Sequence, residues 1–140
     1  MIKKIIASVL LTASVLTFVS IPALADGGQS FYASFNSYDS GYGSLNGYKN
    51  GKKYKLTAGN ASLDVTTMNG KGAVNISLRQ HKFWGQDPVF STKTVEWTGH
   101  YTLPGVPATG SDYYLFFQCT PGISKLNTQY TIAGTVHDHR

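Results

Sequence analysis

The chain has 140 residues, of which 41% are apolar, 13% aromatic and 14% charged, with a formal net charge of +5. Globular proteins average about 25% charged residues, so this composition argues against a charge-rich disordered tail, a coiled coil or a polybasic nucleic-acid arm. The length is typical of a single domain, and we expect no nucleic-acid partner.

Residues 1–25 have the pattern of a secretory signal peptide. Two lysines near the start precede an apolar run over residues 5–21, and small residues at alternate positions lead up to Ala25. Cleavage after Ala25 leaves a mature domain of residues 26–140, with ten basic and seven acidic side chains and a net charge of +3. We therefore expect a secreted, extracellular protein without a stable membrane anchor.

Alternation of apolar and polar residues predicts the first strands of the mature chain. Phe31, Ala33 and Phe35 alternate with polar neighbours and indicate a strand. Segments 44–48 and 52–57 flank an Asn-Gly pair, which favours a hairpin turn. The Gly- and Tyr-rich stretch 37–51 is the most biased segment, a candidate flexible lead-in or surface loop.

A second hairpin is predicted from segments 61–67 and 73–79. Leu63 and Val65 share a face of the first segment, and Val74, Ile76 and Leu78 share a face of the second. The stretch 80–87 is irregular, and Pro88 closes it.

The next pattern predicts one long strand over 92–103, with Val95, Trp97, Tyr101 and Leu103 in phase and Gly99 marking a bulge or bend. In this pattern Trp97 belongs to the core.

The segment 113–120 is apolar on both faces, which indicates a central strand or one with an aromatic strip outside. Tyr130, Ile132 and Val136 then define a last strand over 128–136. The sum is an all-β protein, an antiparallel sandwich of seven or eight strands, with a partly closed barrel as the alternative.

Cys119 is the single cysteine, so no disulfide forms within the chain. Its place near the end of an apolar strand predicts a buried thiol. A monomer is expected, with a Cys119-linked dimer as the alternative.

The inventory of catalytic groups is thin. The mature chain has one glutamate, Glu96, which should face solvent, and its aspartates are mostly in turn-like positions. Asp64 lies mid-strand, opposite in phase to Leu63 and Val65. A buried Cys119 should have low reactivity as a nucleophile. We therefore expect neither an enzyme nor a cofactor.

His137 and His139 are the metal candidates, because they share a face of an extended tail and paired imidazoles suit zinc or copper. A solvated polar tail explains them as well, so no metal is predicted.

Binding has more support from the sequence. Four lysines lie within seven residues and are interleaved with tyrosines that could stack on sugar rings: Lys49, Lys52, Lys53 and Lys55, with Tyr48 and Tyr54. A solvated hairpin with a charged edge is the simpler alternative. Trp84, with His81 nearby in the irregular segment, is the best candidate for an exposed aromatic residue.

The favoured hypothesis is a secreted, non-catalytic binding protein that recognises cell-wall or extracellular polysaccharide or another anionic surface. A secreted antimicrobial protein or protein inhibitor is the first alternative. A structural or matrix protein is the second.

Overall fold

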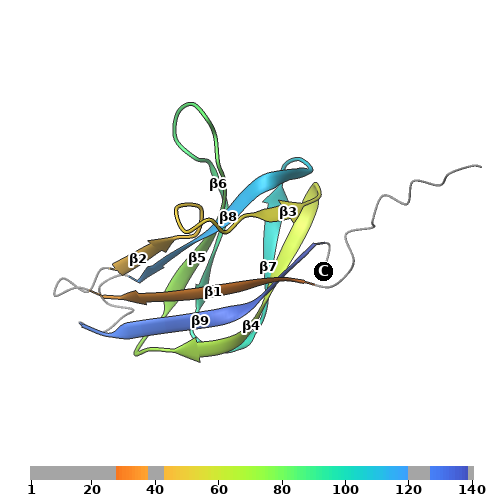
Figure 1. Ribbon diagram of the computed structural model, residues 1–140. Coiled ribbons are helices and arrows are strands. Elements are labelled where there is room, and N and C mark those ends of the chain that lie inside the picture. Colours follow the sequence, from red (N-terminus) through yellow and green to blue (C-terminus); the bar gives the residue numbers. More distant parts are fainter. Residues whose placement is uncertain (1–27, 38–42, 120–126, 139–140) are drawn as a thin grey trace, which may run out of the picture.

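A computed structural model describes residues 28–37, 43–119 and 127–138. These residues contain no helix, and so none long and apolar enough to cross a bilayer. They form the strands of Figure 1: β1 (Gln29–Asn36), β2 (Gly43–Asn46), β3 (Tyr54–Leu56), β4 (Gly59–Asn69), β5 (Val74–Gln80), β6 (Val89–Val95), β7 (Gly99–Val106), β8 (Gly110–Cys119) and β9 (Gln129–Asp138). The predicted signal peptide lies outside the described residues.

The strands form two antiparallel sheets packed face to face. One sheet has the order β1-β9-β4-β7, and the other has the order β2-β8-β5-β6, with β3 also paired to β8. No pairing among the described strands joins the two sheets. The predicted sandwich is therefore confirmed, and the barrel alternative is wrong.

The antiparallel pairs are nested inside one another along the chain. β1 pairs with β9, β2 and β3 pair with β8, β4 pairs with β7, and β5 pairs with β6. The chain is thus a long hairpin rolled into two sheets, which is the pattern of a jelly roll. The loop between β5 and β6 is the apex of this hairpin, and it projects from the body in Figure 1.

Both predicted hairpins are wrong, because the segments involved pair with distant partners. β2 and β3 do not pair with each other: Leu45 lies opposite Phe117, and Tyr54 lies opposite Tyr113, both on β8. They are two parts of one interrupted edge strand. The predicted Asn-Gly turn is present and connects these two parts, with Gly51 at a φ of 74°.

The second predicted hairpin fails because β4 and β5 belong to different sheets. The turn between them carries the chain across the sandwich instead of back along the same sheet. Within the biased segment 37–51, residues 43–46 form β2 and residues 47–51 form the turn, while 38–42 lie outside the described residues.

The predicted long strand 92–103 is also two strands in different sheets. β6 ends at Val95, and β7 begins at Gly99. The crossing between them breaks the alternation, so Trp97 is 73% exposed instead of buried. Glu96 is exposed, as predicted.

The core follows the predicted alternation in the remaining strands. Side chains from β1, β4, β5, β8 and β9 that share a face are buried between the sheets: Phe31, Ala33, Phe35, Leu63, Val65, Val74, Ile76, Leu78, Leu115, Phe117, Tyr130, Ile132 and Val136. β8 is a central strand, between β2–β3 and β5. Cys119 at its end is fully buried, as predicted.

This burial predicts the reactivity of Cys119. In the native protein a thiol-specific reagent should label Cys119 far more slowly than in denaturant, because the thiol is shielded by the core. Timed labelling followed by mass spectrometry measures the two rates. Rapid labelling of native protein would contradict the core position and would favour the Cys119-linked dimer.

Candidate functional site

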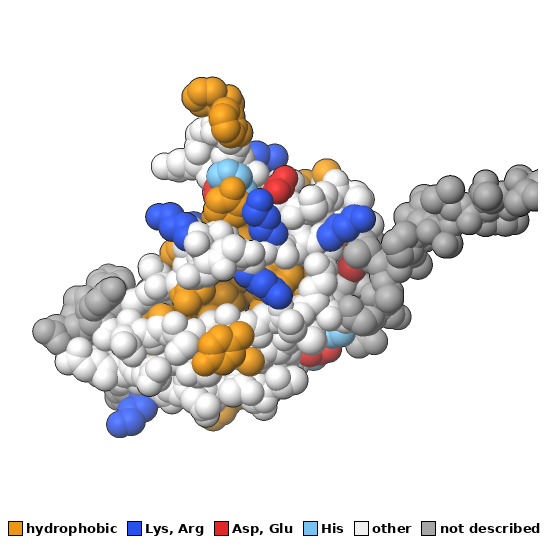
Figure 2. Space-filling view, viewed as in Figure 1, with side chains coloured by type: hydrophobic (Ala, Val, Ile, Leu, Met, Phe, Trp, Pro, Cys, Tyr) orange, Lys and Arg blue, Asp and Glu red, His pale blue; other side chains and the backbone are white. Residues whose placement is uncertain are grey.

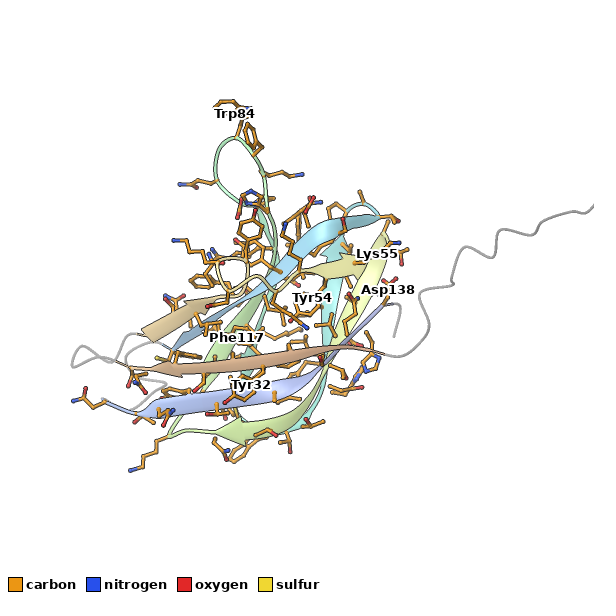
Figure 3. The ribbon with its side chains drawn as sticks, viewed as in Figure 1. Tyr32, Tyr54, Lys55, Trp84, Phe117 and Asp138 are labelled. Atoms are coloured by element: carbon orange, nitrogen blue, oxygen red, sulfur yellow. The ribbon has the colours of Figure 1, made fainter. Side chains whose placement is uncertain are left out.

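The loop over residues 81–88 presents two large aromatic rings to solvent. Residues 82–86 are all exposed, and Phe83 and Trp84 each have 84% of their surface accessible. The two rings contact each other edge to face, with centroids 5.0 Å apart. Gly85 has a φ of 83°, a left-handed conformation that suits glycine and turns the chain at the tip. In Figure 3 Trp84 lies at the end of the loop, away from both sheets.

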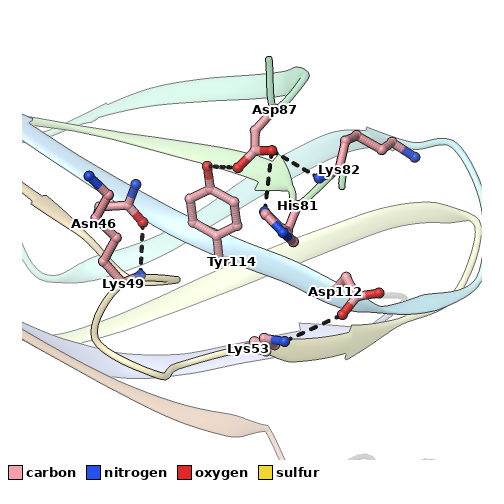
Figure 4. Close-up of polar contacts among 8 residues, drawn as sticks. All are labelled: Asn46, Lys49, Lys53, His81, Lys82, Asp87, Asp112 and Tyr114. Atoms are coloured by element: carbon pink, nitrogen blue, oxygen red, sulfur yellow. Dashed lines mark hydrogen bonds and ion pairs between the residues drawn. The ribbon is translucent and has the colours of Figure 1, made fainter. Parts of the chain in front are cut away.

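Asp87 holds the base of this loop together. Its Oδ1 accepts a hydrogen bond from the Lys82 backbone N–H at 2.9 Å and lies 3.5 Å from His81 Nδ1. Its Oδ2 accepts a hydrogen bond from the Tyr114 hydroxyl at 2.8 Å (Figure 4). One carboxylate therefore ties both ends of the loop to the central strand β8.

Backbone hydrogen bonds close the loop below this carboxylate. Gln80 N–H donates to the Pro88 carbonyl at 3.3 Å, and His81 N–H donates to the Asp112 carbonyl at 2.9 Å. The exposed tip therefore stands on a base that is bonded to β8 as well as across its own neck.

The electrostatics of Asp87 favour the ionised carboxylate. Desolvation by burial alone would raise the pKa of Asp87. The hydrogen bonds from Lys82 and Tyr114 and the interaction with His81 outweigh it and hold this pKa below its ordinary value. Burial, with Asp87 adding to its effect, raises the pKa of Tyr114 to about 12. At neutral pH the pair is a phenol donating to a carboxylate.

Tyr48 connects the lysine-rich turn, residues 47–53 between β2 and β3, to the loop. Its ring stacks on His81 with centroids 3.9 Å apart and contacts Tyr114 at 5.7 Å. Lys53 Nζ lies 4.8 Å from the Tyr48 ring centroid and 3.6 Å from Asp112 Oδ1. The structure thus brings together three of the predicted binding residues, Tyr48, Lys53 and His81.

The surroundings of the loop are basic. Residues 44–53, 79–89 and 110–114 together carry five lysine or arginine side chains and two acidic ones: Lys49, Lys52, Lys53, Arg79 and Lys82, with Asp87 and Asp112. Lys55 lies away from the loop, where its backbone bonds to the Gln29 side chain of β1. Both acids have partners, Asp87 as described above and Asp112 with Lys53. Figure 2 shows basic side chains spread below the apolar tip on this face.

Tyr54 does not join the predicted binding surface. It is 2% exposed and belongs to the core, where burial raises its pKa. The reason is strand parity: Tyr54 and Leu56 both face inward, and Lys55 between them faces solvent. Its ring is therefore not available to stack on a ligand.

A small apolar depression lies between β1 and the β2–β3 edge, on the face seen in Figure 2. Its walls include Phe31, Leu45 and Phe117, and Asn50 and Lys52 belong to its lining. Phe31 and Phe117 belong to the core, and Leu45 packs against it. The depression is therefore a gap at the open edge of the sandwich.

On the other sheet, Asp64 links two histidines that the sequence does not connect. Its carboxylate oxygens lie 2.6 Å from His100 Nδ1 and 2.8 Å from His137 Nε2. Thr135 Oγ1 is also 2.8 Å from His137 Nε2. The Nε2 atom of His137 therefore already has partners on β4 and β9.

The position of His137 bears on the metal candidates. His137 is 8% exposed in a strand, not part of a solvated tail, and His139 lies outside the described residues. Within the described ranges, no group of three His, Cys, Asp or Glu side chains is placed to hold a metal ion.

Sequence reasoning missed Phe83, Asp87 and Tyr114. An adjacent Phe-Trp pair in a polar stretch ending in Gly-Gln-Asp-Pro could have indicated an aromatic loop tip. The role of Asp87 had no such signal, because its partner Tyr114 comes from a strand 27 residues away. Comparison of the chain with protein families, curated proteins and solved structures gives no match.

The depressed pKa of Asp87 predicts a pH-dependent stability. A carboxylate with a lowered folded-state pKa stabilises the fold above its unfolded-state pKa, about 3.9, and loses this contribution as the pH falls through the folded pKa. Asp87→Asn should lower the free energy of unfolding by about 1–3 kcal/mol at pH 6, since hydrogen bonds to a charged group are lost. The variant should then lose less additional stability than wild type between pH 6 and pH 3.

Urea titrations at both pH values measure this difference. Asp112→Asn is the matched control, because the Asp112 carboxylate is 55% exposed and makes a surface ion pair with Lys53. Equal pH profiles for the two variants would contradict the role of Asp87.

Proposed function

We propose that this chain is a secreted, non-catalytic binding protein that attaches to an anionic cell surface through the loop over residues 81–88. The observation that carries the proposal is the exposure of Phe83 and Trp84 at the tip of a loop whose base is fixed by Asp87. Burying one phenylalanine side chain gains about 1.5–3 kcal/mol, and these two rings leave that gain for a partner.

The charge around the loop supports an anionic partner. The basic side chains of the turn and of the loop outnumber the acidic ones, and the acids are already paired. A surface of this sign attracts phosphate- or carboxylate-bearing partners and raises the rate of encounter. The signal-like N-terminus supports secretion to where such surfaces occur.

The ring positions favour this proposal over sugar stacking through the tyrosines. Tyr54 is in the core, and Tyr48 already stacks on His81. Two of the rings expected to hold sugars are therefore used within the protein.

A polysaccharide is the second candidate partner, on the evidence of a shallow depression beside the loop. Asn46, Arg79, Gln86 and Tyr114 line it and offer amide, guanidinium and phenol groups for hydroxyl contacts. Arg79 also lies over the Phe116 ring, with Cζ 4.0 Å from its centroid. The antimicrobial, inhibitor and matrix alternatives stay predictions.

Retention on cells tests the proposal. Trp84→Ala should weaken retention by intact bacterial cells or isolated envelopes about tenfold or more, the effect of removing a central aromatic contact. Its urea unfolding midpoint should stay at the wild-type value, because Trp84 is exposed. Co-sedimentation with the cells gives the bound fraction.

Trp97→Ala is the matched control, since Trp97 is a comparably exposed tryptophan outside the loop. Equal retention of the Trp84→Ala and Trp97→Ala variants would refute attachment through the loop.

A further inference from the structure

We infer that the partner of the loop is the interfacial zone of an anionic lipid bilayer, into which the Phe83 and Trp84 rings insert. This inference rests on the proposed attachment through the loop and names its ligand. The lipid would be recognised by two chemistries together, apolar rings for the acyl boundary and basic side chains for the phosphate headgroups.

The tip has the shape that insertion needs. The exposed residues 82–86 stand clear of both sheets, as the position of Trp84 in Figure 3 shows. The loop can therefore enter the headgroup region while the folded body stays in water. Tryptophan is enriched at this depth, because its ring is apolar and its indole N–H still reaches water or headgroup oxygens.

The charges are placed behind the tip, where headgroups would lie. Lys82 is exposed and directly precedes Phe83. Lys49 and Lys52 are exposed on the neighbouring turn, which Tyr48 joins to the loop by stacking on His81. Anionic headgroups attract such lysines by about 1 kcal/mol each, which is about fivefold in binding.

The tip itself fits lipid better than sugar. Phe83 carries no polar side-chain atom, and its ring meets Trp84 edge to face, so the pair is a compact apolar wedge. The polar groups that could bond sugar hydroxyls line the depression beside the loop, and Phe83 lines it as well. Trp84 is not part of that lining, so a sugar held there would leave the Trp84 ring in water.

Vesicle binding tests the inference. The protein carries Trp97→Phe, so that Trp84 is the sole fluorescent tryptophan. Vesicles of phosphatidylcholine mixed with phosphatidylglycerol should shift Trp84 emission to shorter wavelength and carry the protein through flotation. Vesicles of phosphatidylcholine alone should bind more weakly, and high salt should weaken binding to the mixed vesicles.

Two variants separate the rings from the charges. In a protein that keeps Trp97, Trp84→Ala should reduce flotation with mixed vesicles about tenfold or more, and Lys82→Gln should reduce it about fivefold. Soluble polyglycerol phosphate, a wall-type polyanion, should bind without any shift of Trp84 emission.

The outcomes distinguish this inference from the proposed function. If cell retention depends on Trp84 but no vesicle shifts its emission, the lipid assignment is overturned and attachment through the loop stands. Flotation that is unchanged in Trp84→Ala would overturn insertion in favour of lysine-only adsorption. If the wild-type protein binds neither cells nor vesicles, both proposals are overturned together.

Discussion

The nested antiparallel pairing of the strands is the constraint on which the rest of this molecule depends. Each outer pair, from β1–β9 inward to β4–β7, encloses the next, and among the described strands β5 and β6 alone are both consecutive and paired. The neighbouring connections either cross between the sheets or bulge from the interrupted edge strand. The β5–β6 loop joins two neighbouring strands of one sheet, so it does not have to bridge the distance between the sheets. It is therefore able to project into solvent.

The Asp87 carboxylate fixes the base of this projecting loop. A projecting loop of eight residues would normally be mobile, since few contacts oppose its conformational entropy. Here the carboxylate bonds the loop to itself through Lys82 and to the central strand through Tyr114. Stacking of Tyr48 on His81 adds the lysine-rich turn to the same base. A fixed base lowers the ordering cost that the exposed rings incur on binding.

The sequence predicts the strands of this fold better than their partners. Alternation places Phe31 and Ile76 in the core and marks Cys119 as buried, because period-two patterns depend only on local residues. Pairing depends on where the chain crosses the sandwich, which a turn sequence does not encode. The same crossing explains the exposure of Trp97.

For the candidate site, exposure of Trp84 was predictable from its polar surroundings, and burial of Tyr54 was predictable from its phase with Leu56. The Asp87–Tyr114 hydrogen bond was not predictable, because the fold brings the two residues together.

Photo-crosslinking in intact cells tests the central claim, that the loop tip is the contact surface. With a photoreactive amino acid in place of Trp84, we predict covalent adducts with membrane lipid, and far fewer when it replaces Trp97. Absence of adducts from position 84, or equal yields from both positions, would contradict the claim.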